Sequence, residues 1–131
     1  DNEVGEMRRI LNSFLQFIEQ DDSESIIVAA TNNQKLLDQA LFRRFDDVLH
    51  YTLPTSKEIK RLFEYKIKAY DNYFIISKEI IKAAEGLSHA EIARVCDDAI
   101  KNSILSDEPI TSKAVIALLS ERQNVYTCKE A

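Results

Sequence analysis

Cysteine and glycine are scarce in this sequence, with two residues of each among 131. Cys96 falls on the apolar face of a helical pattern and Cys128 lies near the C-terminus, and no CxxC motif or Cys/His cluster has zinc spacing. We therefore expect two reduced thiols in an intracellular protein. No GxxxxGK[ST] loop occurs, so the chain lacks the usual backbone cradle for phosphate groups.

Long apolar runs and an excess of basic charge are also lacking. No run approaches the roughly 20 apolar residues needed to cross a membrane, and the polar, acidic N-terminus has no signal-peptide pattern. The net charge of −5 argues against a general nucleic-acid binder, because neutralising phosphates requires a basic surface. Hydrophobic residues make up 45% and charged residues 30%, which indicates a soluble globular protein. We expect it to be cytoplasmic. A start at Asp1 rather than Met suggests part of a longer protein.

The first part of the sequence combines an amphipathic helix with two short apolar runs. Apolar residues recur at three- and four-residue steps over 4–18, which predicts the helix. The run 26–30 is typical of a strand covered on both faces of a parallel sheet. A short helical turn is expected over 36–41, and a second strand over 48–53 stops at Pro54. Two such strands do not make a stable sheet alone, so this part of the chain is expected to require further strands.

Beyond Pro54 the pattern is helical, and two helix starts are marked by capping boxes. Thr55 is followed three residues later by Glu58, and Ser88 by Glu91. In each pair the hydroxyl and the carboxylate can satisfy amides of the first helical turn. Helices are therefore predicted to begin at these two positions.

Single capping residues indicate two more helices. Ser77 can cap one that Gly86 is placed to end. Thr111 can cap a last helix, while the tail after Glu121 has no clear period and is expected to fray. The predicted order is helix, strand, short helix, strand and four helices, with a boundary near Pro54.

Some polar residues suggest chemistry, although each has a simpler interpretation. Asn32 follows a buried strand, at the sheet edge where ligands bind, but a turn-capping role is favoured on position alone. Arg43 and Arg44 offer planar, permanently charged donors for phosphate oxygens, but taken alone an ion pair with Asp38, Asp46 or Asp47 is favoured. The two histidines, His50 and His89, are expected to have surface or packing roles.

Together, these segments resemble an AAA ATPase. The residues 27–32, 37–41 and 43–46 resemble, in order and spacing, the sensor-1 strand and arginine-finger segment of that family. The residues 86–93 resemble the start of the third lid helix, and 5–15 resemble the helix that follows the Walker B strand. The likeness covers nearly the whole chain.

The resemblance implies a fold class and an activity. Residues 1–54 would be the C-terminal part of the large α/β subdomain, with the sensor-1 strand and the following strand of a P-loop NTPase parallel sheet. Residues 55–131 would be a four-helix AAA lid, so that the chain is mostly helical overall. The parent protein would bind ATP and Mg²⁺, assemble as a ring, commonly a hexamer, and remodel protein substrates.

The missing motifs limit what these residues do by themselves. Without a P-loop or Walker B acids, the chain alone is expected neither to hydrolyse ATP nor to bind it tightly. Its expected partners are neighbouring AAA subunits and a protein substrate, not nucleic acid. The alternative is a non-enzymatic protein-interaction module derived from an AAA lid.

The resemblance also implies individual roles. Asn32 would be sensor 1, which places the attacking water. Arg43 would be the arginine finger of the adjacent subunit's active site, and Arg44 the second arginine, which supports the interface. Many members have an insertion between the two arginines, so their adjacency leaves open which is the finger. The implied cofactor-binding residues are Lys66, near the ribose, Ser88, and His89 and Ala90, near the adenine.

Overall fold

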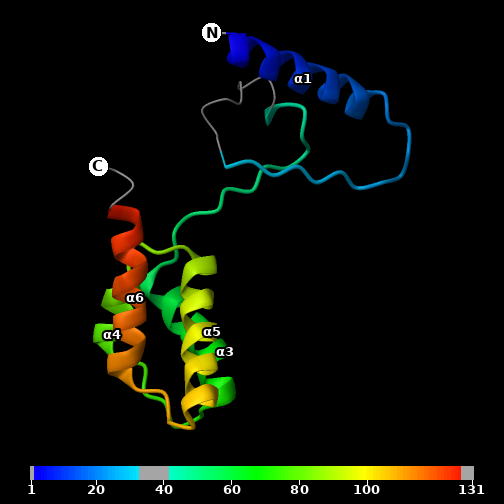
Figure 1. Cartoon of the computed structure of the whole chain (residues 1–131). Coiled ribbons are helices and arrows are strands. Elements are labelled where there is room, and N and C mark those ends of the chain that lie inside the picture. Colours follow the sequence, from blue (N-terminus) through cyan, green and yellow to red (C-terminus); the bar gives the residue numbers. More distant parts are fainter. Residues whose placement is uncertain (1, 33–41, 128–131) are drawn as a thin grey trace. The chain divides into compact units, whose positions relative to one another are not determined.

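The computed structural model describes residues 2–32 and 42–127. Five helices are assigned within these ranges, and no strand occurs in them (Figure 1). The mostly helical character predicted from the sequence is thus confirmed. The chain divides into two compact units, Asp1–His50 and Tyr51–Ala131.

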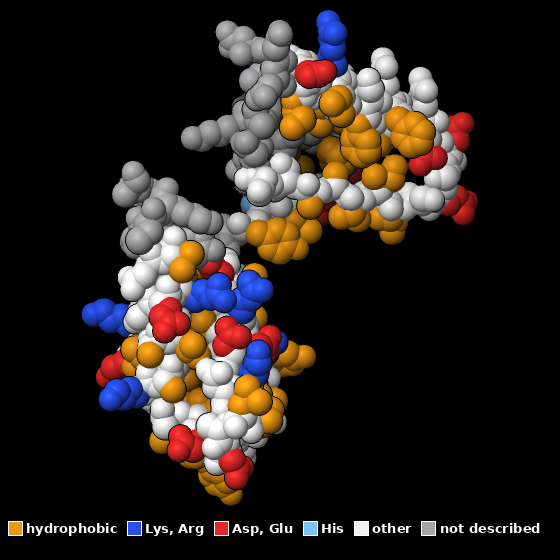
Figure 2. Space-filling model, viewed as in Figure 1, with side chains coloured by type: hydrophobic (Ala, Val, Ile, Leu, Met, Phe, Trp, Pro, Cys, Tyr) orange, Lys and Arg blue, Asp and Glu red, His pale blue; other side chains and the backbone are white. Residues whose placement is uncertain are grey.

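The first unit contains α1 (Asn2–Glu19), which confirms the predicted opening helix. Among its described hydrophobic side chains only Leu15 is buried, at 3% exposure. Figure 2 shows exposed hydrophobic side chains gathered over this unit. The described residues of this unit therefore form almost no core. The exposed large apolar residues of α1 are Met7, Ile10, Phe14 and Phe17.

The two predicted strands are not formed. Residues 26–30 and 48–53 have no regular secondary structure, and Ile26 and Val28 are 91% and 86% exposed. A strand exists only when its amides and carbonyls pair with a neighbouring strand. The described residues offer these two runs no such neighbour, so their apolar side chains stay at the surface. The predicted turn over 36–41 lies outside the described residues.

The second unit is a bundle of four helices, as predicted for this part of the chain. They are α3 (Ser56–Tyr70), α4 (Lys78–Ala84), α5 (His89–Ser106) and α6 (Ser112–Thr127). The helix α3 packs against α4 and α5, and α6 packs against α4 and α5 (Figure 1).

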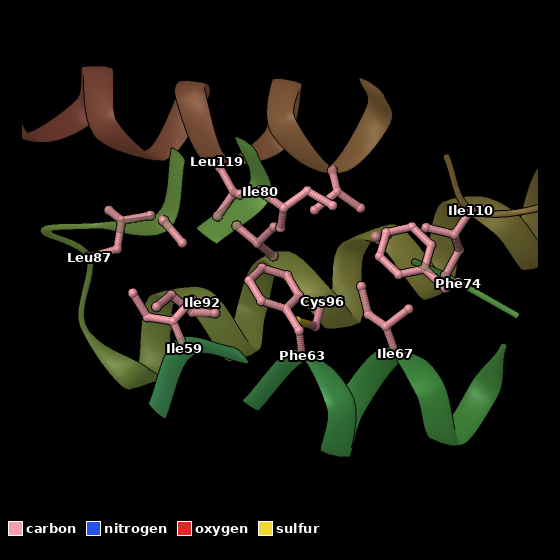
Figure 3. Close-up of a cluster of buried hydrophobic side chains, with 14 residues drawn as sticks. Ile59, Phe63, Ile67, Phe74, Ile80, Leu87, Ile92, Cys96, Ile110 and Leu119 are labelled. Atoms are coloured by element: carbon pink, nitrogen blue, oxygen red, sulfur yellow. The ribbon is translucent and has the colours of Figure 1, made fainter. Parts of the chain in front are cut away.

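Apolar residues at helical spacing form one closed core in this bundle. Figure 3 shows the α3 side chains Ile59, Phe63 and Ile67 directed toward α5, with Leu119 of α6 on the opposite side. Phe63 is fully buried. Hydrophobic burial therefore stabilises this unit without any element from outside it. Other buried members are Phe74, Ile80, Ala84, Leu87, Ile92, Val95, Cys96, Ala99, Ile110 and Val115.

The predicted helix caps are confirmed. Glu58 Oε2 accepts hydrogen bonds from both Thr55 N and Thr55 Oγ1 at 2.7 Å. These bonds from Thr55 hold the pKa of the Glu58 carboxyl below its usual value. Ser77 Oγ accepts from the amide of Ile80, and Thr111 Oγ1 accepts from the amide of Ala114.

The prediction that the chain frays after Glu121 is wrong. The helix α6 continues to Thr127. Tertiary contacts hold its last turns, because Gln123 donates to carbonyl groups at the end of α4 and Arg122 lies 3.8 Å from Asp98 of α5. Such contacts leave no period in the local sequence, which explains the error.

Gly86 and Gly5 provide a matched pair of stability predictions. Gly86 has φ = 86°, a left-handed conformation, and nothing lies within 4 Å of an added Cβ. We expect Gly86→Ala to lower the free energy of unfolding by about 1–2 kcal/mol, for conformational reasons alone. Gly5 lies inside α1 with equally open space, so Gly5→Ala should raise the helicity of the chain. Urea unfolding followed by circular dichroism measures both, and a neutral Gly86→Ala would contradict this interpretation.

Candidate functional site

The candidate residues of the first unit lie at its surface. Asn32 is exposed at a bend after the irregular run 26–31, and Arg43 is exposed in a turn. Arg44 Nη1 lies 3.1 Å from Glu19 Oε1, at the last residue of α1. Arg44 therefore forms an ion pair, but with Glu19 and not with Asp46 or Asp47, while Asp38 lies outside the described residues.

Arg43 differs from its neighbour. None of the four ion pairs between described residues includes Arg43. Its guanidinium group is therefore held by no carboxylate in the part of the chain that the structure describes. An exposed arginine of this kind can reach an anion outside its own subunit.

The remaining candidates lie in the bundle, three of them at the start of α5. Ser88 Oγ accepts from Glu91 N at 3.3 Å, and Glu91 Oε2 accepts from Ser88 N at 3.0 Å. This capping box fixes the backbone at the start of α5. The exposed residues His89 and Ala90 directly follow Ser88 there.

Lys66 lies on α3 and forms an ion pair across to α5. Its Nζ lies 2.8 Å and 3.1 Å from the two carboxylate oxygens of Asp97. The hydrogen bond to Asp97 raises the pKa of Lys66. Both side chains are partly exposed, so exchanging Asp97 for another acceptor costs little. The ammonium group of Lys66 is bound to Asp97 in this structure. A contact with a ribose is compatible with this geometry, but the ammonium group would first have to exchange Asp97 for the ribose.

The structure groups the predicted residues only partly. Ser88, His89 and Ala90 are adjacent, whereas Asp97 follows His89 by eight residues, about 12 Å of helix. Lys66 is thus anchored about two turns along α5 from His89. Asn32, Arg43 and Arg44 belong to the other unit. The partners of Arg44 and Lys66, which are Glu19 and Asp97, were not predicted from the sequence.

No cluster of three or more metal-binding side chains exists among the described residues. The sequence likewise contains no glycine-rich loop that could bind the phosphates of a nucleotide. The second unit has an exposed first helical turn and an exposed ion pair, and the first unit has an exposed arginine. In addition, no described helix is long and apolar enough to cross a membrane.

Cys96 is a core residue. Its side chain is fully buried beside Asp97, and burial raises the pKa of its thiol to about 12, with the Asp97 charge adding to the shift. A thiol of this kind stays protonated at neutral pH and is a poor nucleophile. The predicted reduced thiol at the apolar face is confirmed, while Cys128 lies outside the described residues.

The buried thiol predicts a loss of stability at alkaline pH. An unfolded cysteine ionises above pH 9.0, whereas the folded one stays protonated to about 12. Between these values the unfolded state has released a proton that the folded state keeps, so the free energy of unfolding falls by about 1.4 kcal/mol per pH unit. Urea unfolding at pH 8 and 10 should show this fall, and Cys96→Ala should reduce it. The Cys128→Ser variant is the control, and equal falls in Cys96→Ala and the unaltered chain would contradict the prediction.

Residues 1–53 match the family model of the ATPase family associated with various cellular activities (AAA). Over 103 residues the chain is 41% identical to an uncharacterized AAA family ATPase of Sinorhizobium fredii, with 79% of this chain and 31% of the relative covered. It is also 35% identical, over 103 aligned residues, to the ATP-dependent zinc metalloprotease FtsH of Parabacteroides distasonis, with 75% of this chain and 15% of the relative covered.

A third relative is the proteasome-activating nucleotidase of Saccharolobus islandicus, 33% identical over 115 residues, with 79% of this chain and 28% of the relative covered. No solved structure matches the chain. The chain spans less than a third of the length of each of these relatives. The family match over residues 1–53 and the three relatives together support a fragment of an AAA ATPase.

Proposed function

We propose that this chain is the rear part of an ATP-hydrolysing AAA subunit, comprising the sensor-1 and arginine-finger segment and the helical lid. The parent protein would assemble as a ring, commonly a hexamer, and use ATP hydrolysis to remodel a protein substrate in the cytoplasm. One relative named an AAA family ATPase and one named an ATP-dependent zinc metalloprotease support the activity, and the match over residues 1–53 supports the segment.

The contrast between the two arginines supports the site assignment most directly. Arg44 is paired with Glu19 within its own unit, while Arg43 is exposed and has no ion pair among the described residues. A finger that serves a neighbouring subunit must be free to leave its own surface, and an arginine held by a carboxylate is less so. Arg43 is therefore our choice for the finger, and Arg44 supports the segment that carries it.

Residues of both units would contact the nucleotide. Asn32 would orient the attacking water, which an amide can do without adding charge. From the lid, His89 and Ala90 would contact the adenine, with Lys66 near the ribose and Ser88 fixing the turn. ATP and Mg²⁺ would be held by P-loop and Walker B residues outside this chain, and this chain alone would not bind ATP tightly.

The test begins with the reading frame upstream of Asp1 and the purified full-length product. We expect a P-loop, an apolar strand that ends in Asp-Glu, and steady-state ATP hydrolysis. A full-length product without these motifs and without ATP turnover would sink the proposal. That outcome would favour the non-enzymatic module, whose lid helices bind a partner.

A further inference from the structure

Gln123 of α6 caps the end of α4. Its Nε2 donates to Glu85 O at 2.7 Å and more weakly to Ala83 O at 3.4 Å. The last carbonyl groups of a helix have no partner within the helix and need donors from elsewhere. The helix α4 has only seven residues, too few to be stable alone. A side chain from α6 therefore completes the short helix that precedes α5.

The same contact fixes the connection from α4 to α5. Ser56, the first residue of α3, donates from its Oγ to Glu85 Oε1 at 3.3 Å. Leu87 is buried in the core, and its amide donates to Ala84 O at 3.2 Å. The connection is thus attached to α6 through Gln123, to α3 through Ser56 and to the core through Leu87. Its next residue is Ser88, the N-cap of α5.

We propose that Gln123 is a positioning residue for nucleotide binding, acting through this connection on the first turn of α5. The proposal rests on the proposed function, in which Ser88, His89 and Ala90 contact the nucleoside. Gln123 touches no nucleotide itself. Without its amide donor, the carbonyl of Glu85 loses its partner and the connection gains freedom. Nucleotide binding in the variant then has to order the first turn of α5, which the unaltered protein already holds in place before binding.

The first experiment measures the connection in the chain itself. Gln123→Met keeps the size of the side chain and removes its donors, while Gln123→Lys restores a donor. We expect the amide of Leu87 to exchange its hydrogen faster in Gln123→Met than in the unaltered chain, and Gln123→Lys to reverse this. The amide of Val95, further along α5, should not change. Ser120→Ala, at an exposed position of the same helix, is the control. Equal exchange at Leu87 in all variants would overturn the positioning role.

The second experiment measures nucleotide binding in the full-length protein that contains this chain. In Gln123→Met we expect the KM for ATP to rise about three- to tenfold, the range for one lost hydrogen bond, with kcat within about twofold. Gln123→Lys should return the KM toward its original value. A merely destabilising change would instead lower kcat through loss of folded enzyme and leave the KM unchanged.

The two experiments distinguish a failure of the positioning role of Gln123 from a failure of the proposed function. If the unaltered full-length protein turns over ATP but Gln123→Met has the same KM, the positioning role is overturned and the proposed function stands. If the unaltered protein shows no turnover, the proposed function fails, and the inference about nucleotide binding falls with it. The exchange result at Leu87 would then still describe the contact between α6 and α4.

Discussion

Arg43→Ala should slow ATP hydrolysis by the assembled parent protein by ~10³ or more. The transferred phosphoryl group carries charge that a planar, permanently charged guanidinium group neutralises in the transition state. An arginine supplied in trans accelerates hydrolysis by ~10³–10⁵ in GTPases. Because Arg43 is exposed and unpaired among the described residues, its loss should not disturb its own unit. The measurement is kcat for ATP in the assembled protein, with the oligomer verified by mass.

Two matched variants make the Arg43 result specific. Arg9→Ala removes an exposed arginine of α1, so it changes the net charge equally and should leave kcat unchanged. Arg44→Ala breaks the exposed pair with Glu19, which is worth at most about 1 kcal/mol, and should lower activity less than Arg43→Ala. A larger loss in Arg44→Ala would move the finger to Arg44. Unchanged turnover in an assembled Arg43→Ala protein would sink the role.

Phe63→Ala should have the largest effect on the stability of the bundle. Phe63 is fully buried on α3, in the core shown in Figure 3. Truncating a buried phenylalanine removes its apolar contacts and leaves a cavity, at a cost of about 3–5 kcal/mol. Domains of this size are stable by only about 5–15 kcal/mol, so the variant should be partly unfolded at 37 °C. Urea unfolding of the whole chain, followed by circular dichroism, measures the change.

Tyr65 provides the control for Phe63 on the same helix. It is 78% exposed, two residues further along α3. Tyr65→Ala removes an aromatic ring of similar size at no cost in core packing, so it should change the free energy of unfolding by less than about 0.5 kcal/mol. Equal effects of Phe63→Ala and Tyr65→Ala would mean that the bundle core is not formed as described.

The second unit was predictable from sequence because its signals are local. The capping boxes at Thr55 and Ser88 each depend on residues three apart, and the core positions Ile59, Phe63 and Ile67 follow one helical stripe. Each helix therefore carries its own start signal and its own buried face. The bundle contains enough apolar surface to close its core, so local signals and the final fold agree.

The first unit was predicted less well because strands depend on neighbours. The composition of 26–30 favours a buried strand, yet a strand needs hydrogen-bond partners that the sequence of the strand cannot supply. In this chain the run is irregular and Ile26 is exposed. The sequence of 26–30 therefore indicates that the segment is suited to a buried strand in a sheet. It does not indicate the irregular conformation that the segment has in this chain.

Polar contacts between residues far apart in the sequence were also not predicted. The pair of Lys66 and Asp97 joins residues 31 positions apart, and Gln123 lies 38 positions from Glu85. No local spacing identifies such partners, because they are set by the packing of α3 on α5 and of α6 on α4. The resemblance placed Lys66 near a ribose but gave no sign that a carboxylate holds it.

Mixing two kinds of inactive subunit tests whether Arg43 of one subunit serves the nucleotide of its neighbour. One subunit carries Arg43→Ala and keeps its P-loop, while the other keeps Arg43 and has its P-loop lysine replaced by alanine. Each alone should be nearly inactive. In mixed assemblies the intact Arg43 can complete the intact P-loop site next to it, so ATP hydrolysis should return to a substantial fraction of the original rate. Mixed assemblies that stay as inactive as the separate variants would show that Arg43 does not act on the neighbouring subunit's nucleotide.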